Sequence, residues 1–124
     1  MHILISNRSD TPIYQQIVDA IRQDIINGTL AEGDALPSIR MLAKDLSVSV
    51  ITTKKAYELL EAQGYIQTQP QKGSVVSRRS AQLAKEHKQS AMEQHILDAI
   101  DISKELQLNQ NAFLELVSEL YREV

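Results

Sequence analysis

A run of seven residues, 49–55, brings together side-chain types that can contact a nucleic-acid duplex. Ser49 and Thr52 carry hydroxyl groups, which can hydrogen-bond a phosphate or a base edge. Lys54 and Lys55 carry ammonium groups, which can pair with phosphates. Aliphatic residues stand between them, and an aliphatic side chain can contact the methyl group of thymine in the major groove. These residue types indicate binding to a duplex.

The apolar spacing predicts that this run begins a helix, which Ser49 caps and which extends to about Gln63, just before Gly64. Helical geometry assigns one face of this helix to the core: Thr53, Ala56, Tyr57 and Leu60. The same geometry turns four residues outward: Val50, Ile51, Lys54 and Lys55. Two bulky aliphatic side chains beside two lysines suit a duplex groove better than water. The alternative is that one aliphatic residue tucks under the preceding turn while the lysines are only solvated.

Two further helices and a hairpin are predicted around this helix. Residues 12–27 carry apolar side chains at helical spacing, with Thr11 as the expected cap. Ser38 is expected to cap a second, shorter helix, whose apolar residues are Ile39, Leu42, Ala43 and Leu46. Two short strands, 65–69 and 74–77, flank a turn. This order predicts a winged helix-turn-helix, in which the start of the third helix enters the major groove.

The tail, residues 80–124, is predicted to form two helices that join two copies of the chain. The first helix covers about 82–106, and the second begins after Asn109 or Asn111 and has a clean apolar stripe. Burial of that stripe against a second subunit would contribute roughly 1.5–3 kcal/mol for each large side chain. The predicted dimer interface contains Ile96, Ile100, Phe113, Leu116, Val117, Leu120 and Tyr121. The alternative is that the last helix packs on residues 12–27 of the same chain.

Charge is divided along the chain, although the formal net charge of the whole is −3. Residues 36–79 hold seven basic and three acidic side chains, which gives a net charge of +4. Residues 80–124 hold four basic and eight acidic side chains, which gives a net charge of −4. A basic middle can hold phosphates even when the whole protein is acidic, so the net charge does not argue against nucleic acid.

Features of several other protein classes are absent from the sequence. The lack of cysteine excludes disulfides, thiolate zinc sites and a cysteine nucleophile, and it fits a reducing cytosol. No apolar run is long enough to span a membrane, and the first residues lack the basic region of a signal peptide, so a cytoplasmic location is predicted. There are no paired carboxylates in an apolar frame and no glycine-rich phosphate loop, and His2, His87 and His95 are scattered. We therefore expect no enzyme activity, metal or cofactor.

Many separated positions within residues 10–78 resemble the signature of GntR-type regulators. The resemblance is specific because the positions agree in order and spacing. The matching motifs are Pro12-Ile13-Tyr14-Gln15-Gln16-Ile17, Gly28-Thr29-Leu30, Gly33-Asp34-Ala35-Leu36-Pro37-Ser38-Ile39-Arg40, Leu42-Ala43, Val48-Ser49, Ala56-Tyr57, Leu60-Glu61 and Gly64-Tyr65-Ile66. The short tail with its closing amphipathic helix resembles the YtrA subfamily, whose members carry a two-helix dimerisation arm and often neighbour genes for ABC-type transporters.

The resemblance implies DNA-contacting roles for particular positions. Arg40 matches the family's phosphate- or base-contacting arginine, and its alternative role is a salt bridge within the domain. Lys72 and Gly73 match the tip of the wing, which reaches the minor groove or the DNA backbone, and the alternative for Lys72 is a purely solvent-facing position. The full predicted DNA-binding set is Ser38, Arg40, Ser49, Val50, Ile51, Thr52, Lys54, Lys55, Lys72 and Gly73.

Two positions depart from the family pattern. Many relatives have arginine where this chain has Val50, so a common contact to guanine is absent and an apolar preference at that base pair is expected in its place. The wing of relatives often has Gly-x-Gly, and Gln71 stands where the first glycine would be. The hairpin is therefore expected to be stiffer or differently twisted than in relatives.

The predicted architecture is mainly α with a small β-hairpin (α+β). A winged helix-turn-helix domain covers residues 1–79 and a two-helix dimerisation arm covers residues 80–124. The predicted function is that of a sequence-specific transcription regulator, a repressor by resemblance, which binds an inverted-repeat operator in double-stranded DNA as a homodimer and controls an ABC-type transporter operon. The alternative is a winged-helix module that binds protein without specific DNA binding. A cleft between arm and winged domain could hold a small-molecule effector, which the sequence does not identify.

Overall fold

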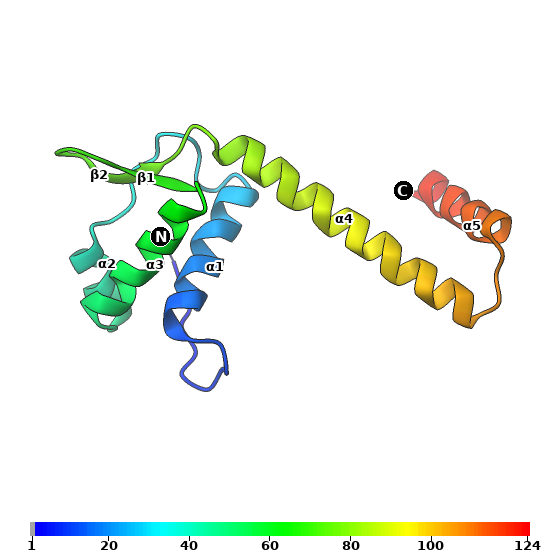
Figure 1. The fold of residues 1–124 in the computed structure, drawn as a ribbon, viewed down its shortest axis with the longest axis horizontal. Helices are drawn as coiled ribbons and strands as arrows, with labels where there is room; N and C mark the ends of the chain where they lie inside the picture. Colours follow the sequence, from blue (N-terminus) through cyan, green and yellow to red (C-terminus); the bar gives the residue numbers. More distant parts are fainter. Residues whose placement is uncertain (1) are drawn as a thin grey trace. The chain divides into compact units, whose positions relative to one another are not determined.

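The computed structural model describes residues 2–124, so Met1, the first residue of the predicted domain, lies outside it. The described chain is mostly helical and has one two-stranded antiparallel sheet, as predicted (Figure 1). In chain order the elements are α1 (Ile13–Ile26), α2 (Ile39–Leu46), α3 (Val50–Ala62), β1 (Ile66–Gln69), β2 (Gly73–Val76), α4 (Ser80–Glu105) and α5 (Gln110–Glu123). The chain forms two compact units, one extending to His87 and the other beginning at Lys88. The functional domain limits at 79 and 80 stay a prediction.

The first unit packs its helices α1, α2 and α3 around one apolar core (Figure 1). Ile17 and Ile21 of α1 and Leu60 of α3 are fully buried. Each such side chain contributes roughly 1.5–3 kcal/mol to folding. Val18 of α1 is also fully buried. The buried face of α1 is therefore wider than a single stripe.

The segment before α1 is part of this core. Ile3 is buried in it and Ile5 packs against it. The side chain of Gln16 holds the segment in place, because its Oε1 accepts the Ser6 N–H at 2.8 Å and its Nε2 donates to the carbonyls of Ser6 and Thr11, each at 2.9 Å. The expectation that Thr11 caps the helix is wrong: the cap position is one residue later and has no side-chain hydrogen bond.

The hairpin of β1 and β2 forms the wing, with Ile66 opposite Val76 and Gln69 opposite Gly73. Residues 33–36 run along the outer edge of β2 as a short third strand-like segment. The Leu36 N–H donates to the carbonyl of Ser74 at 2.9 Å, and the Val76 N–H donates to the carbonyl of residue 34 at 2.9 Å. The β2 edge of the wing is thus hydrogen-bonded to the segment that precedes α2.

In the second unit, the C-terminal part of α4 and the helix α5 are joined by a short turn. The side chain of Asn109 caps α5, because its Oδ1 accepts the Ala112 N–H at 2.8 Å, which confirms the first of the two predicted caps. Ser103 is buried beside the turn and donates its hydroxyl to the Ile100 carbonyl at 2.7 Å. The Leu108 N–H in turn donates to the Ser103 carbonyl at 2.9 Å, which fixes the start of the turn.

Candidate nucleic-acid interface

A tight, hydrogen-bonded turn positions the first turn of α3. Ser47, between α2 and α3, adopts a left-handed conformation with φ 56° and ends α2. The Ser49 Oγ then accepts the Thr52 N–H at 3.0 Å and donates its own proton to Thr52 Oγ1 at 2.7 Å. The Thr53 hydroxyl donates to the Ser49 carbonyl at 3.1 Å. The predicted cap is confirmed, and it satisfies the backbone donors that a helix start leaves free.

The orientation of α3 about its axis follows the prediction. Its buried residues are the four expected ones: Thr53, Ala56, Tyr57 and Leu60. The Tyr57 hydroxyl donates to the carbonyl of Pro37 at 2.7 Å, and burial raises the pKa of this phenol well above its usual value. On the opposite side Ile51 is 81% exposed and Val50 is 42% exposed, so the alternative that these residues tuck under the turn is wrong for Ile51.

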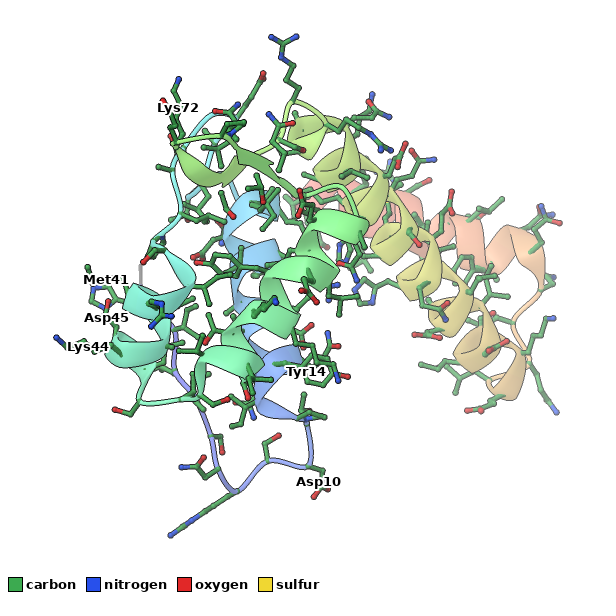
Figure 2. The ribbon with its side chains drawn as sticks, turned by 60° about the vertical axis from the view of Figure 1, so that its left-hand side comes forward. Asp10, Tyr14, Met41, Lys44, Asp45 and Lys72 are labelled. Atoms are coloured by element: carbon green, nitrogen blue, oxygen red, sulfur yellow. The ribbon has the colours of Figure 1, made fainter. Side chains whose placement is uncertain are left out.

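The two lysines of α3 have different surroundings. Lys54 is largely exposed, and its Nζ lies 3.9 Å from Oε1 of Glu58, a loose surface pair that stabilises little. The Nζ of Lys55 lies 4.0 Å from the centre of the Tyr14 ring, a cation–π contact worth about 0.5–1 kcal/mol. Figure 2 shows Tyr14 on α1, across α3 from α2. Lys55 is therefore directed toward α1, and Lys54 is the more available of the two for a phosphate.

The helix α2 supplies a second set of exposed side chains. The Oγ of Ser38 caps it by accepting the Met41 N–H at 3.1 Å, so this hydroxyl has a structural role. Arg40 is exposed, and the two ion pairs in residues 2–124 involve other residues, so the alternative of a salt bridge for Arg40 has no support there. In Figure 2, Met41, Lys44 and Asp45 project from α2 on the side of the view where Lys72 projects from the wing.

The tip of the wing presents Lys72 next to two residues with positive φ. Gln71 has φ 67° and Gly73 has φ 73°, both in the left-handed region, and all three residues are exposed. Glycine adopts this conformation without a steric penalty, whereas a residue with a Cβ is strained there by roughly 1 kcal/mol. The turn closes with a hydrogen bond from the Lys72 N–H to the carbonyl of Gln69 at 3.1 Å. The departure from the family's glycine pattern thus leaves the turn intact but strained at Gln71.

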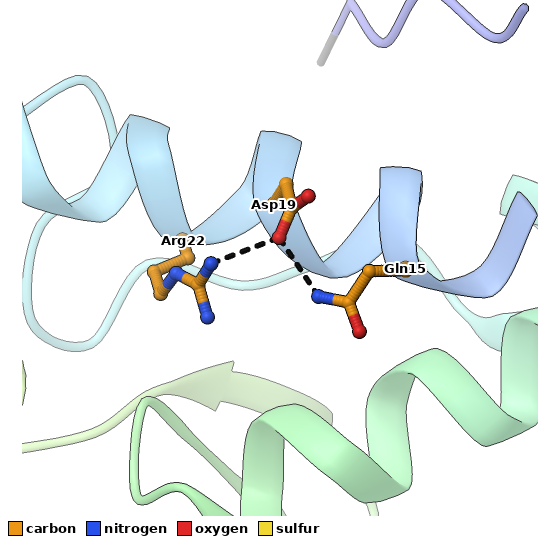
Figure 3. A network of polar contacts seen from close by, with 3 residues as sticks. All are labelled: Gln15, Asp19 and Arg22. Atoms are coloured by element: carbon orange, nitrogen blue, oxygen red, sulfur yellow. Dashed lines mark hydrogen bonds and ion pairs between the residues drawn. The ribbon is translucent and has the colours of Figure 1, made fainter. Parts of the chain in front are cut away.

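Arg22, another basic residue of this unit, is paired with an acidic residue of its own helix. Asp19 of α1 accepts hydrogen bonds from Gln15 Nε2 and from Arg22 Nη2, each at 2.8 Å (Figure 3). These contacts join positions three and four residues apart on one helix, where each pair contributes only a few tenths of a kcal/mol. Arg22 is therefore held within α1, in contrast to Arg40.

The predicted dimer residues line an open apolar surface in the second unit. Leu116, Val117, Leu120 and Ile96 are each between 44% and 53% exposed and Tyr121 is 79% exposed. Ile100 and Phe113 are half-buried. Between α4 and α5 lies a groove of about 630 Å³, lined by Lys88, Ala91, Met92, His95, Ile96, Ala99, Phe113, Leu114 and Val117. His95 and Leu114 also line this groove, although the predicted interface contains neither of them.

Other kinds of site are not seen in the described chain. Within residues 2–124, no helix is long and apolar enough to cross a membrane. The same residues contain no group of three or more histidine, aspartate or glutamate side chains placed to hold a metal ion.

The fold and the exposed face of α3 define a winged helix-turn-helix protein. Residues 13–76, about half of the chain, match the model of bacterial regulatory proteins of the gntR family. The chain belongs to this family, whose members regulate transcription and are not enzymes. The resemblance found in the sequence is thereby confirmed.

Individual relatives agree with this assignment. The chain is 35% identical over 98 residues to the HTH-type transcriptional repressor YtrA of Bacillus subtilis. These 98 residues make up 79% of this chain and 75% of the relative. It also matches much longer regulators, such as the uncharacterised YdeL of Bacillus subtilis, of which it spans only 14%.

Solved structures share the fold. A transcriptional regulator from Oenococcus oeni superposes with a TM-score of 0.78 at 26% identity, over 94% of this chain and 97% of that one. The GntR-family factor YtrA from Sulfolobus acidocaldarius gives a TM-score of 0.60 at 37% identity, over 77% and 97% of the two chains. The same fold occurs, at 24% identity and a TM-score of 0.55, in the DNA-binding domain of AraR in complex with operator ORX1, over 62% and 96% of the two chains.

Proposed function

We propose that this protein represses transcription by binding an inverted-repeat operator as a homodimer, with the first turn of α3 in the major groove. The observation that carries the proposal is the two-sided character of α3. Its inner face is sealed by Tyr57 and Leu60, while Ile51 and Lys54 on the outer face remain open to solvent. Repression is proposed from the similarity to the repressor YtrA of Bacillus subtilis.

The homodimer part of the proposal is supported by the open apolar face of the second unit. A closing helix that leaves Leu116, Leu120 and Tyr121 half-exposed or more is unfavourable in water unless another surface covers it. Pairing two copies about a two-fold axis would cover the same patch on each. It would also place two recognition helices about 34 Å apart, or a multiple of that distance, which requires an operator with two inverted half-sites.

The cellular role follows from the same similarity. We propose a cytoplasmic regulator of an ABC-type transporter operon, because this chain is 35% identical to the repressor YtrA of Bacillus subtilis. The resemblance of its tail to the YtrA subfamily implies the link to a transporter. The DNA-contacting set proposed is the predicted one, with Lys54, Arg40 and Lys72 as phosphate contacts and Lys55 as a weaker contributor, since it is held over Tyr14. A small-molecule effector is no part of this proposal.

A gel-shift titration tests the proposal. The probes are the intergenic DNA upstream of the protein's own gene and a length-matched scrambled duplex. We expect a specific complex on the intergenic probe that weakens steeply as salt rises, because binding releases counterions from the phosphates. Equal retardation of both probes at all salt concentrations would contradict specific binding and favour a winged helix that binds protein.

A further inference from the structure

The side chains that α3 presents to its surroundings are unusual for a helix that reads bases through hydrogen bonds. Its sequence, VITTKKAYELLEA, contains no arginine, asparagine or glutamine. Those three side chains are the ones that form paired hydrogen bonds with the major-groove edges of guanine and adenine, a role that lysine can also take with guanine. Of the two lysines, Lys55 lies over the Tyr14 ring and Lys54 is next to Glu58.

The hydroxyl groups of the first turn are also largely engaged within the protein. The Ser49 Oγ accepts the Thr52 N–H, and its proton is donated to Thr52 Oγ1 at 2.7 Å. The Thr53 hydroxyl is buried and donates to the Ser49 carbonyl. Hydrogen-bond readout from this turn is therefore limited, and the most accessible atoms it offers are aliphatic.

Ile51 is the most exposed of these aliphatic side chains, at 81%, with Val50 beside it at 42%. Both residues belong to the stretch 36–79, which carries a net charge of +4, and such a charge suits the phosphates that border a groove. The one apolar group on a base edge in the major groove is the 5-methyl group of thymine. A duplex that brings a thymine methyl to Ile51 would bury both groups from water.

We infer that Ile51, supported by Val50, selects a T·A pair in each operator half-site by contact with the thymine 5-methyl group. This inference deepens the proposed function and rests on it. The readout depends on a methyl group, so it distinguishes thymine from uracil, which has the same hydrogen-bonding edge. Burial of one methyl group corresponds to about fourfold in affinity.

The test uses a duplex recovered by in vitro selection from random sequence with the purified full chain. Each thymine of one half-site is replaced in turn by deoxyuridine, and dissociation constants are measured by fluorescence anisotropy. For the unmodified protein we expect about fourfold weaker binding at one or two positions and no change at the others. Ile51→Ala should bind the thymine and uracil duplexes equally, whereas Ile51→Val should retain part of the discrimination.

A matched control is Met41→Ala, which removes another exposed apolar side chain, from α2, and should keep the full thymine preference. Melting curves check that both alanine variants fold; Ile51 is so exposed that its loss should not lower stability. Specific binding without any uracil effect, or an effect that persists in Ile51→Ala, would overturn the inference and leave the proposed function standing. If selection recovers no specific duplex, the proposed function fails and the inference fails with it.

Discussion

Replacing Lys54 with alanine should weaken DNA binding without weakening the fold. The ammonium group is largely exposed and its pair with Glu58 at 3.9 Å is loose, so the free energy of unfolding should change by no more than about 0.5 kcal/mol. Alanine also favours a helix slightly more than lysine does. Each phosphate contact steepens the fall of log K with log salt by about 0.9, where K is the association constant for DNA. If the contact contributes nothing at about 1 M salt, its loss should lower the affinity roughly eightfold at about 0.1 M salt.

The assay is anisotropy titration of an operator duplex at several salt concentrations, together with urea denaturation of each variant. Lys85→Ala is the matched control, because it removes the same charge from an exposed position on α4 outside the proposed DNA-contacting set. We expect the salt slope to fall by about one in Lys54→Ala and to stay unchanged in the control. Equal slopes and affinities for Lys54→Ala and the unmodified protein would refute the orientation of α3 toward the phosphates.

Three further predictions concern the arm, the core and the wing. Leu116→Asp combined with Leu120→Asp should give monomers, because dimer formation would bury unpaired carboxylates; light scattering that still reports a dimer mass would place the interface elsewhere. Tyr57→Phe should lower the free energy of unfolding by about 1–2 kcal/mol in urea, because the Pro37 carbonyl loses its donor. Burial raises the Tyr57 pKa in the folded state, so the unmodified protein should lose stability as pH rises above 10, where unfolded tyrosine ionises, and Tyr57→Phe should lack this component. Gln71→Gly should raise stability by about 0.5–1 kcal/mol by relieving the positive φ, and an unchanged denaturation midpoint would argue against strain there.

Helical periodicity predicted the main features of the fold because they depend on local sequence. The caps at Ser38 and Ser49 and the buried face of α3 are where the pattern places them, and Asn109 is one of the two caps that it allowed for α5. What the pattern could not show depends on contacts between distant segments. The burial of Ile3 and the hydrogen bonds of residues 33–36 along β2 arise only when the chain has folded, and neither leaves a periodic signal.

At the candidate site too, the sequence pattern gave the direction of side chains but not their contacts with other segments. Spacing along α3 correctly gave the outward direction of Ile51 and of both lysines, since that follows from 3.6 residues per turn. It could not show that Lys55 lies over Tyr14, because that contact joins two helices. Nor could it show that the hydroxyls of Ser49 and Thr52 bond to one another, which reduces what they can offer to a base.

Affinity cleavage with the substitution Ile51→Cys tests the central claim most directly, that the first turn of α3 lies in the major groove. The chain contains no cysteine, so this single thiol can be coupled to an iron chelate without competing sites. With an operator duplex, we expect two symmetric clusters of cuts, separated by about one helical turn of DNA or a multiple of it. An absence of cuts from a labelled protein that still binds the duplex would contradict the placement of the first turn of α3 in the major groove.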